Sequence, residues 1–379
     1  MKNISQIYIV LSFFIYIISC SVIYMILKDI VNNRFNKKVD KLKGTFGNEV
    51  LKQLTSVRIQ KGISRIDINK IDMKLDKKCY FKAFNNAIME FNNNKDNHKF
   101  TRTYLENFEA VIIKKIKKVS KKDDIVKNYQ AFLLGEYRLN NFEINKFLFD
   151  CMESKSVYLR VTSLKSISKI GNINNFVEAL LYISNENKYI HNKVLLDIIN
   201  QFEGDKIILN HTLMDKFYLF NTGIKKIIIE EFKNSDFTSV KDKLLTLLKD
   251  EKCEKEIKIS IIKYFSSIKY NEVKSEIIKF LGEKDWEYRA ICSTALSNYK
   301  DEKSKVALLK SINDKNWHVR YNSAISLLKF KDSNIVDIIL NQNDKYSKEI
   351  LIYAMFMENK ISYEEYLQKF KKVEVESIC

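Results

Sequence analysis

"EKDWEYRAICSTAL" (residues 283–296) and "DKNWHVRYNSAISL" (residues 314–327) are two versions of one phrase, 31 residues apart. In both, a polar or acidic start precedes a tryptophan, an arginine follows three residues later, and small or apolar residues then recur at helical spacing. Trp286 therefore corresponds to Trp317, and Arg289 to Arg320. Each phrase predicts one helix.

A second helix follows each phrase. A polar break comes first, "KDEK" at 300–303 or "KDSN" at 331–334, and an apolar-periodic stretch comes next, "VALLKSI" at 306–312 or "IVDIIL" at 335–340. Polar breaks of this length join antiparallel helices. The unit that is repeated is therefore expected to be a helical hairpin.

Weaker copies of the unit extend toward the N-terminus. Each copy has an apolar residue followed by a basic one, and hydrophobic residues stand about seven and ten positions later. The copies recur in steps of 31 to 33 residues, and Asn192 takes the basic position in one of them. The anchor positions are 127, 160, 192, 225, 258, 289 and 320. One hairpin cannot bury its apolar face alone, so a fixed period indicates a stacked array. We predict about seven repeats over 123–345 and closing helices over 346–379.

The motif resembles a known repeat family. "VYLRVTSLKSISKIGN" (157–172), Tyr288-Arg289 and His318-Val319-Arg320 match the start of PBS-lyase HEAT-like repeats, whereas the signatures of tetratricopeptide and ankyrin repeats do not occur. The resemblance implies an all-α, armadillo-like α-solenoid. It also implies that the repeat positions are structural, with arginines bonding to acidic residues of the array. These positions are Arg160, Arg289, Arg320, Asp285 and Asp314.

The N-terminus carries an apolar segment. After a short tail (1–6), residues 7–27 read "IYIVLSFFIYIISCSVIYMIL", 21 residues without a charge, which is long enough to cross a bilayer. Basic residues crowd its C-terminal side from Lys28 onward, so the positive-inside rule predicts a single-pass anchor with the bulk of the chain in the cytoplasm. A lipoprotein anchored at Cys20 of "IISC" and a cleaved signal peptide are the alternatives.

Positive charge is concentrated next to this segment. The chain has a net charge of +18, and residues 1–122, with 25 basic and 10 acidic residues, supply most of it. Residues 28–122 are therefore predicted to be a basic juxtamembrane helical region that contacts an anionic membrane surface; a solvated, lysine-rich helix face is the alternative. The candidate lipid contacts are Lys37, Lys38, Lys41, Lys43, Lys114, Lys115, Lys117 and Lys118.

No motif indicates catalysis. The chain has 8 glycines and no proline, and it lacks the phosphate-binding, nucleophile and metalloprotease motifs. Six cysteines and four histidines are dispersed without metal-site spacing, so no metal and no cofactor are expected. HEAT-like bilin lyases and DNA glycosylases are the enzymatic alternatives that the resemblance brings, but the nearly neutral array does not indicate a nucleic-acid groove.

The expected function is protein–protein interaction. Arrays of this kind bind through rows of residues on their second helices, and the candidates here are Lys274, Lys279, Lys303, Lys305 and Lys310. Trp286 and Trp317 are candidates too, with packing on the preceding turn as the alternative. We therefore expect a bacterial membrane-anchored scaffold with a membrane-associated protein partner. The resemblance implies a membrane enzyme such as an envelope glycosyltransferase as that partner.

Overall fold

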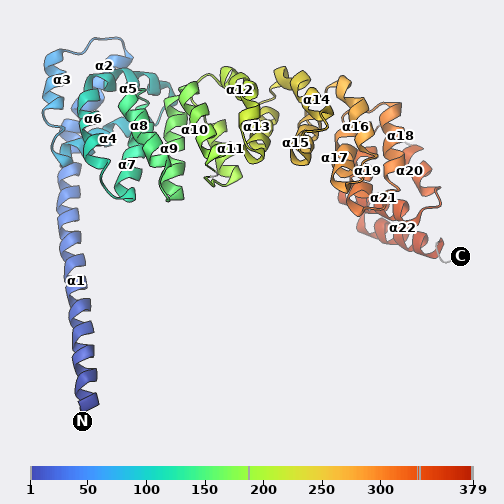
Figure 1. The fold of residues 1–379 in the computed structure, drawn as a ribbon, viewed down its shortest axis with the longest axis horizontal. Coiled ribbons are helices and arrows are strands. Elements are labelled where there is room, and N and C mark those ends of the chain that lie inside the picture. Colours follow the sequence, from blue (N-terminus) through green and yellow to red (C-terminus); the bar gives the residue numbers. More distant parts are fainter. Residues whose placement is uncertain (1, 187, 331, 333, 377–379) are drawn as a thin grey trace. The chain divides into compact units, whose positions relative to one another are not determined.

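The computed structural model describes residues 2–186, 188–330, 332 and 334–376, and within them the regular elements are all helices (Figure 1). This confirms the predicted all-α class. Met1 of the predicted tail and residues 377–379 of the predicted closing segment lie outside the described residues. The chain divides into two units, residues 1–176 and 177–379, which are described separately.

Unit 1 begins with one long helix, α1, and continues with shorter ones. Their bounds are α1 Lys2–Leu42, α2 Asn48–Arg58, α3 Arg65–Asp72, α4 Lys78–Phe91, α5 His98–Leu105, α6 Glu109–Val119, α7 Asp124–Tyr137, α8 Phe142–Met152 and α9 Val157–Ile170. A π-helical turn, Lys43–Gly47, joins α1 to α2. Helix α10, Ile173–Asn185, crosses the boundary between the units.

Helix α1 projects away from the other helices of unit 1 (Figure 1). Its 41 residues make it about 60 Å long. The apolar side chains from Leu11 to Val31 are exposed, and only the C-terminal end of the helix packs, where Val39 is buried. The structure thus has one described helix that is long and apolar enough to cross a membrane, and a signal sequence has the same features. Cys20 lies exposed within this uninterrupted helix.

The predicted juxtamembrane region is a folded part of unit 1 from Phe46 onward. Phe84 lies at the centre of its core, with ring centroids 6.3 Å from Tyr104 and 5.3 Å from Phe108. Two hydrogen bonds join this core to α7. Tyr137 Oη donates to Asn85 Oδ1 at 2.5 Å in a buried contact, and Asn92 Nδ2, at the C-terminal end of α4, donates to the Glu136 carbonyl at 2.9 Å in a partly buried one. Helices α2 to α6 therefore cap the first hairpin and share its core.

Helices α7 and α9 approach each other closely at Gly135. A Cβ atom at this position would lie 2.7 Å from Ser166 Oγ and 2.9 Å from Ser166 Cα. The serine hydroxyl donates to the Ala131 carbonyl of α7 at 2.7 Å. A glycine facing a serine lets the two backbones meet without an unpaired polar group.

Unit 2 is a series of helical hairpins. First helices alternate with second helices, which are the shorter ones in every hairpin except α11–α12, and a closing helix follows. The first helices are α11 Asn192–Asn200, α13 Thr222–Asn234, α15 Lys255–Phe265, α17 Trp286–Leu296, α19 Trp317–Leu327 and α21 Lys345–Met357. The second helices are α12 Lys206–Asp215, α14 Lys241–Lys249, α16 Lys274–Phe280, α18 Glu302–Ser311 and α20 Asn334–Leu340, and the closing helix is α22 Tyr363–Glu376.

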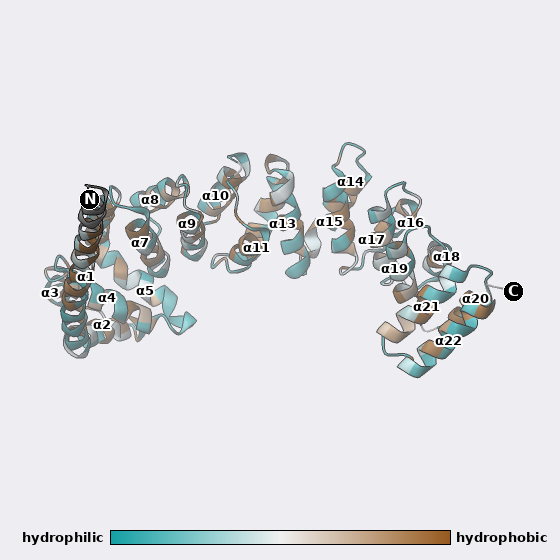
Figure 2. Ribbon diagram, turned by 90° about the horizontal axis from the view of Figure 1, so that it is seen from below, coloured by the Kyte–Doolittle hydropathy of each residue, from teal (hydrophilic) through white to brown (hydrophobic). Residues whose placement is uncertain are grey.

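The first helices of unit 2 pack one on the next, from α11 through to α21, and no comparable row joins the described second helices. In Figure 2 these helices carry hydrophobic and hydrophilic residues side by side, as amphipathic helices do. Each hairpin therefore closes the core of its neighbour mainly through its first helix. This arrangement is that of a HEAT-like helical repeat.

The predicted anchor residues share one place in the fold. Six of the seven stand at the fourth residue of a first helix, at 127, 160, 225, 258, 289 and 320. The exception is Asn192, which is the first residue of α11, so that Leu195 takes the anchor position there. Because Leu195 is apolar and buried, the apolar–basic pattern placed the anchor of that repeat at Asn192, three residues too early.

Candidate interaction surface of the C-terminal hairpins

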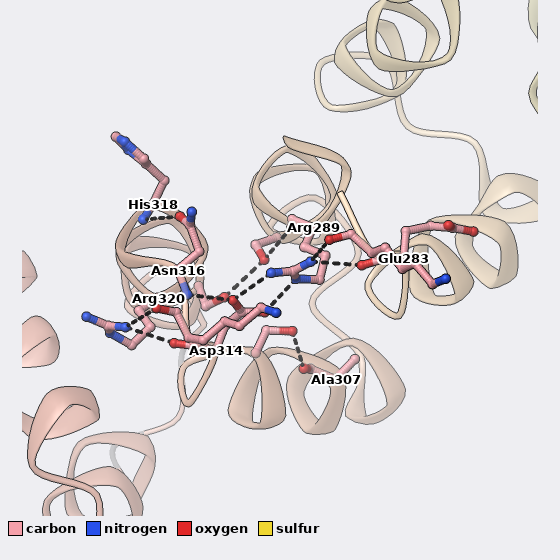
Figure 3. A network of polar contacts seen from close by, with 12 residues as sticks. Glu283, Arg289, Ala307, Asp314, Asn316, His318 and Arg320 are labelled. Atoms are coloured by element: carbon pink, nitrogen blue, oxygen red, sulfur yellow. Dashed lines mark hydrogen bonds and ion pairs between the residues drawn. The ribbon is translucent and has the colours of Figure 1, made fainter. Parts of the chain in front are cut away.

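Asp314 connects two consecutive hairpins (Figure 3). Its Oδ2 accepts from Arg289 Nε at 2.6 Å, and its Oδ1 accepts from Arg289 Nη2 at 3.0 Å and from the Asn316 backbone N–H at 2.8 Å. The arginine belongs to α17, and the aspartate belongs to the loop that leads into α19. A planar guanidinium and a carboxylate that bond at two points fix both the distance and the angle between the elements that carry them.

The pKa values at this pair follow from its contacts. Burial alone would raise the pKa of Asp314, but the hydrogen bonds from Arg289 and from the Asn316 N–H outweigh it and hold the pKa below the ordinary value of 3.8. The hydrogen bond to Asp314 raises the pKa of Arg289. Both groups are therefore charged at neutral pH.

The repeat arginines also bond to the backbone of their own repeat, as seen at Arg160, Arg289 and Arg320. In each, Nη1 donates to the backbone carbonyls six and five residues earlier in the chain. The accepting carbonyls are those of Ser154 and Lys155, of Glu283 and Lys284, and of Asp314 and Lys315, at 2.7–3.1 Å. The repeat arginine thus satisfies carbonyls of the loop before its own helix, which is a structural role.

The tryptophans begin α17 and α19 and remain partly exposed, at 39% for Trp286 and 42% for Trp317. The Trp286 ring stacks on His318, with centroids 5.1 Å apart, and the Trp317 ring stacks on Tyr321 at 4.9 Å. Asp285, just before Trp286, forms an exposed ion pair with Lys255 at 2.8 Å. Packing and exposure therefore coexist at both tryptophans.

Two of the five candidate lysines are occupied by ion pairs between hairpins. Lys274 pairs with Asp301, and Lys305 Nζ lies 3.0 Å from Asp332 Oδ2. Both aspartates lie 27 residues after their lysine, in the loop that leads into the next second helix. Hydrogen bonds from these lysines lower the pKa of both aspartates, although burial at Asp301 opposes the effect. These two lysines stabilise the array.

The other three candidates, Lys279, Lys303 and Lys310, are exposed, and within the described ranges no ion pair engages them. Lys303 and Lys310 lie at a groove between α16 and α18 with a volume of about 620 Å³. The groove is lined by Ile278, Leu281, Gly282, Glu302, Lys303, Val306, Ala307, Lys310, Ser311 and Asp314. Val306 is 44% exposed at its floor.

Charge at this groove is positive once the internal pairs are counted. Asp314 is held by Arg289, and Glu302 shares Lys305 with Asp332, so that Lys303 and Lys310 leave a net charge of +1 among these residues. Lys303 and Lys310 face the solvent without a counter-charge from the described residues. The groove therefore offers an apolar floor with a basic rim.

The lysines predicted to contact lipid fall into two groups. Lys37, Lys38, Lys41, Lys117 and Lys118 are exposed. The others are engaged within unit 1: Lys43 pairs with Glu90 at 3.3 Å, Lys114 with Asp76 at 2.9 Å, and Lys115 Nζ lies over the Phe81 ring at 4.8 Å. Burial lowers the pKa of Lys115, against the opposing effect of Asp76.

Residues beyond Trp317 form a second cavity that the sequence did not predict. It has a volume of about 210 Å³ and lies between α19, α21 and α22. Its aromatic residues Tyr346, Tyr353, Tyr366 and Phe370 come from the C-terminal segment, where the repeat motif has faded. The available signal was a spacing of seven residues from Tyr346 to Tyr353 and of four from Tyr366 to Phe370, and such helical spacing is equally typical of core positions.

No group of three or more histidine, cysteine, aspartate or glutamate residues within the described ranges could hold a metal ion.

Cys151 and Cys292 are buried, and burial raises the pKa of Cys151 to about 12, so this thiol is not reactive.

The chain is similar in architecture to solved helical structures. Human deoxyhypusine hydroxylase in complex with glycerol is 12% identical, with 78% of this chain and 96% of that chain covered and a TM-score of 0.28. An engineered protein is 12% identical, with 85% and 98% covered and a TM-score of 0.32. No family model matches the chain. No curated protein matches it. At these TM-scores the likenesses assign neither a family nor an activity, and the hairpins themselves show an all-α helical repeat array.

Proposed function

We propose that the chain is a non-enzymatic scaffold, tethered to the cytoplasmic face of a membrane by α1, that recruits a membrane-associated protein through the groove between α16 and α18. The observation that carries the proposal is this groove, with Val306 at an apolar floor and Lys303 and Lys310 at its rim. Its volume of about 620 Å³ is within the range of sites that accept side chains of a partner.

The groove is held in shape by the array. Arg289 and Asp314 bridge α17 to the loop before α19, and Lys274 and Asp301 bridge the starts of α16 and α18. A preformed groove binds with a smaller loss of conformational entropy than a flexible one. Because its free charges are lysines, the best-fitting partner segment presents apolar side chains flanked by carboxylates.

Tethering supports the same proposal. The apolar side chains of α1 from Leu11 to Val31 are exposed. The exposed Lys37, Lys38 and Lys41 follow this segment and suit anionic headgroups. Confinement to a membrane raises the effective concentration of a membrane-associated partner, so a modest interface is sufficient.

The test is site-specific photo-cross-linking in membranes. A benzophenone amino acid replaces Lys303 in the full chain, and we expect a cross-link to one membrane protein that Val306→Asp abolishes. Ile338→Asp is the matched control, because Ile338 is also 44% exposed and stands at the same, fifth position of α20 as Val306 does in α18. Cross-linking that survives Val306→Asp, or is lost equally in Ile338→Asp, would contradict the assignment of the groove.

A further inference from the structure

The second cavity of unit 2, bounded by α19, α21 and α22, combines one arginine with a wall of aromatic rings. Its lining is Trp317, Arg320, Tyr346, Glu349, Ile350, Tyr353, Tyr366 and Phe370. None of these residues lines the groove between α16 and α18, so the cavity is a separate feature and does not depend on the proposed function.

Arg320 differs from its counterpart Arg289 in one respect. Both use Nη1 to bond two carbonyls of the preceding loop. Arg289 directs Nε and Nη2 at the carboxylate of Asp314. The Nε of Arg320 is shielded from solvent and has no hydrogen-bond partner among the described residues. The same guanidinium edge that binds a carboxylate in one repeat is thus available in the next.

The sequence explains the difference. Asp314 stands two residues before Asn316, the residue that caps the start of α19. The residue that caps α21 is Asp344, and the position two residues before it holds Gln342, a neutral side chain whose Oε1 also lacks a hydrogen-bond partner in the described ranges. The last full repeat has therefore exchanged the internal carboxylate for an amide while keeping the arginine.

The walls of the cavity suit a flat apolar group. The Arg320 guanidinium carbon lies 5.3 Å from the centroid of the Tyr346 ring, the Trp317 and Tyr353 centroids are 6.2 Å apart, and Tyr366 lies 5.7 Å from Phe370. Aromatic pairs at such distances attract further rings and aliphatic groups. Glu349 forms an ion pair with Lys345 at 3.7 Å, so the uncompensated charge in the cavity is that of Arg320.

We propose that this cavity binds a carboxylate carried by a flat apolar group, with the carboxylate paired to the Arg320 guanidinium and the apolar group between the aromatic rings. A monoanion fits better than a phosphate dianion, because the one uncompensated charge in the cavity is the single positive charge of Arg320. The volume of about 210 Å³ is below the roughly 300–1,000 Å³ of drug-sized sites, so the ligand is a single residue or a small acid. A free aromatic acid and the C-terminal aromatic residue of a peptide share this chemistry.

The binding test uses the full chain in detergent. The chain has two tryptophans, so Trp286→Phe leaves Trp317 as the fluorescent reporter in the cavity wall. N-acetyl-phenylalanine and benzoate are titrated as probes, with N-acetyl-phenylalanine amide as the uncharged control. We expect the amide to bind at least about tenfold more weakly than the acid, because it loses charge-assisted hydrogen bonds. Tighter binding of N-acetyl-phenylalanine than of benzoate identifies a peptide C-terminus as the source, and the reverse order identifies a free acid.

Gln342→Asp is the decisive variant, because it restores the carboxylate at the position that Asp314 occupies in the preceding repeat. We expect it to raise the unfolding temperature and to weaken N-acetyl-phenylalanine binding at least about tenfold, since the internal carboxylate competes for Arg320. Arg320→Met should abolish binding, and Lys310→Met, in the other groove, should leave it unchanged. Equal binding of acid and amide, unchanged binding in Gln342→Asp, or binding retained by folded Arg320→Met would overturn the proposal.

Discussion

Arg289 and Asp314 form a two-point ion pair between consecutive hairpins, with Nε 2.6 Å from Oδ2 and Nη2 3.0 Å from Oδ1. The arginine also bonds the Glu283 and Lys284 carbonyls of its own repeat. One side chain therefore holds the loop before α17 and the loop before α19 at the same time. Arg320 repeats the two carbonyl contacts, which gives a physical reason for the arginine that both phrases share.

We expect Asp314→Asn to destabilise unit 2. The arginine side chain is 8% exposed, so loss of its carboxylate leaves a largely buried charge, at a cost of about 3 kcal/mol in the free energy of unfolding. Hydrogen exchange followed by mass spectrometry should show lost amide protection in α17 and α19. Asp285→Asn is the control, because its pair with Lys255 is exposed and contributes at most about 1 kcal/mol.

The same pair predicts a pH dependence. The pKa of Asp314 in the folded protein lies below 3.8, so its contribution to stability is complete above about pH 3.8 and is lost as the pH falls through the lower folded value. The destabilisation caused by Arg289→Met should therefore be full at neutral pH and shrink as the pH falls below about 3.8, which acid unfolding of α17 to α19 in the variant and in the unchanged chain measures. An identical acid transition in both would show that the pair contributes nothing.

Gly135→Ala should destabilise unit 1, although alanine is the better helix former. The added Cβ would lie 2.9 Å from the Cα of Ser166, and α9 would have to move away from α7. Overpacking of this kind costs about 1–3 kcal/mol, more than the gain in helix propensity. The urea midpoint of the full chain in detergent measures the effect. Gly44→Ala, which meets nothing within 4 Å, should not lower it.

Lys206 and Glu231 predict the opposite pH behaviour. Glu231 is fully buried, its Oε1 lies 2.7 Å from Lys206 Nζ, and burial raises its pKa above 4.5 despite that lysine. The folded protein therefore holds the proton more tightly than the unfolded chain, and stability falls as the pH rises from about 4.5 through the folded pKa. At neutral pH, Lys206→Met should lower the free energy of unfolding by about 3–5 kcal/mol, because the buried Glu231 carboxylate loses its partner. Near pH 4.5 the decrease should be smaller, because Glu231 is then largely protonated in the folded protein.

Lys243→Met is the matched control for that measurement. Its pair with Asp215 is more than half exposed on both sides and screened by solvent, so its removal should leave the free energy of unfolding nearly unchanged at either pH. An equal effect of the two lysine variants would show that burial of Glu231 does not govern the pH dependence.

The sequence predicted the repeat because its signal was periodic. Small, apolar and basic residues at fixed spacing placed six of seven anchors at the fourth residue of a first helix. The prediction was wrong at Asn192, since the motif's polar slot is filled there by the buried Leu195 three residues later. Periodicity could not assign the cap formed by α2 to α6, because its contacts, such as Tyr137 with Asn85, join positions 52 residues apart without any repeat.

The candidate site was predictable only in part for the same reason. The exposure of the candidate lysines followed from their position on second helices. The ion pair that engages Lys274 but not Lys303 depends on Asp301, which lies one hairpin away from Lys274. The arginine-containing aromatic cavity depends on side chains from three helices that meet only in the fold. Contacts between particular side chains of different helices do not alter the spacing of hydrophobic residues along the sequence, so this spacing could not predict them.

Sidedness of the chain in intact cells tests the central claim most directly. Asn313→Cys places an exposed thiol between α18 and α19, and Cys253→Ser with Cys379→Ser removes other thiols outside α1 that could react. The account predicts that the chain stays in the membrane fraction after carbonate washing and that a membrane-impermeant maleimide labels residue 313 only after lysis. Labelling in intact cells, or release by carbonate, would contradict a scaffold held at the cytoplasmic face by α1.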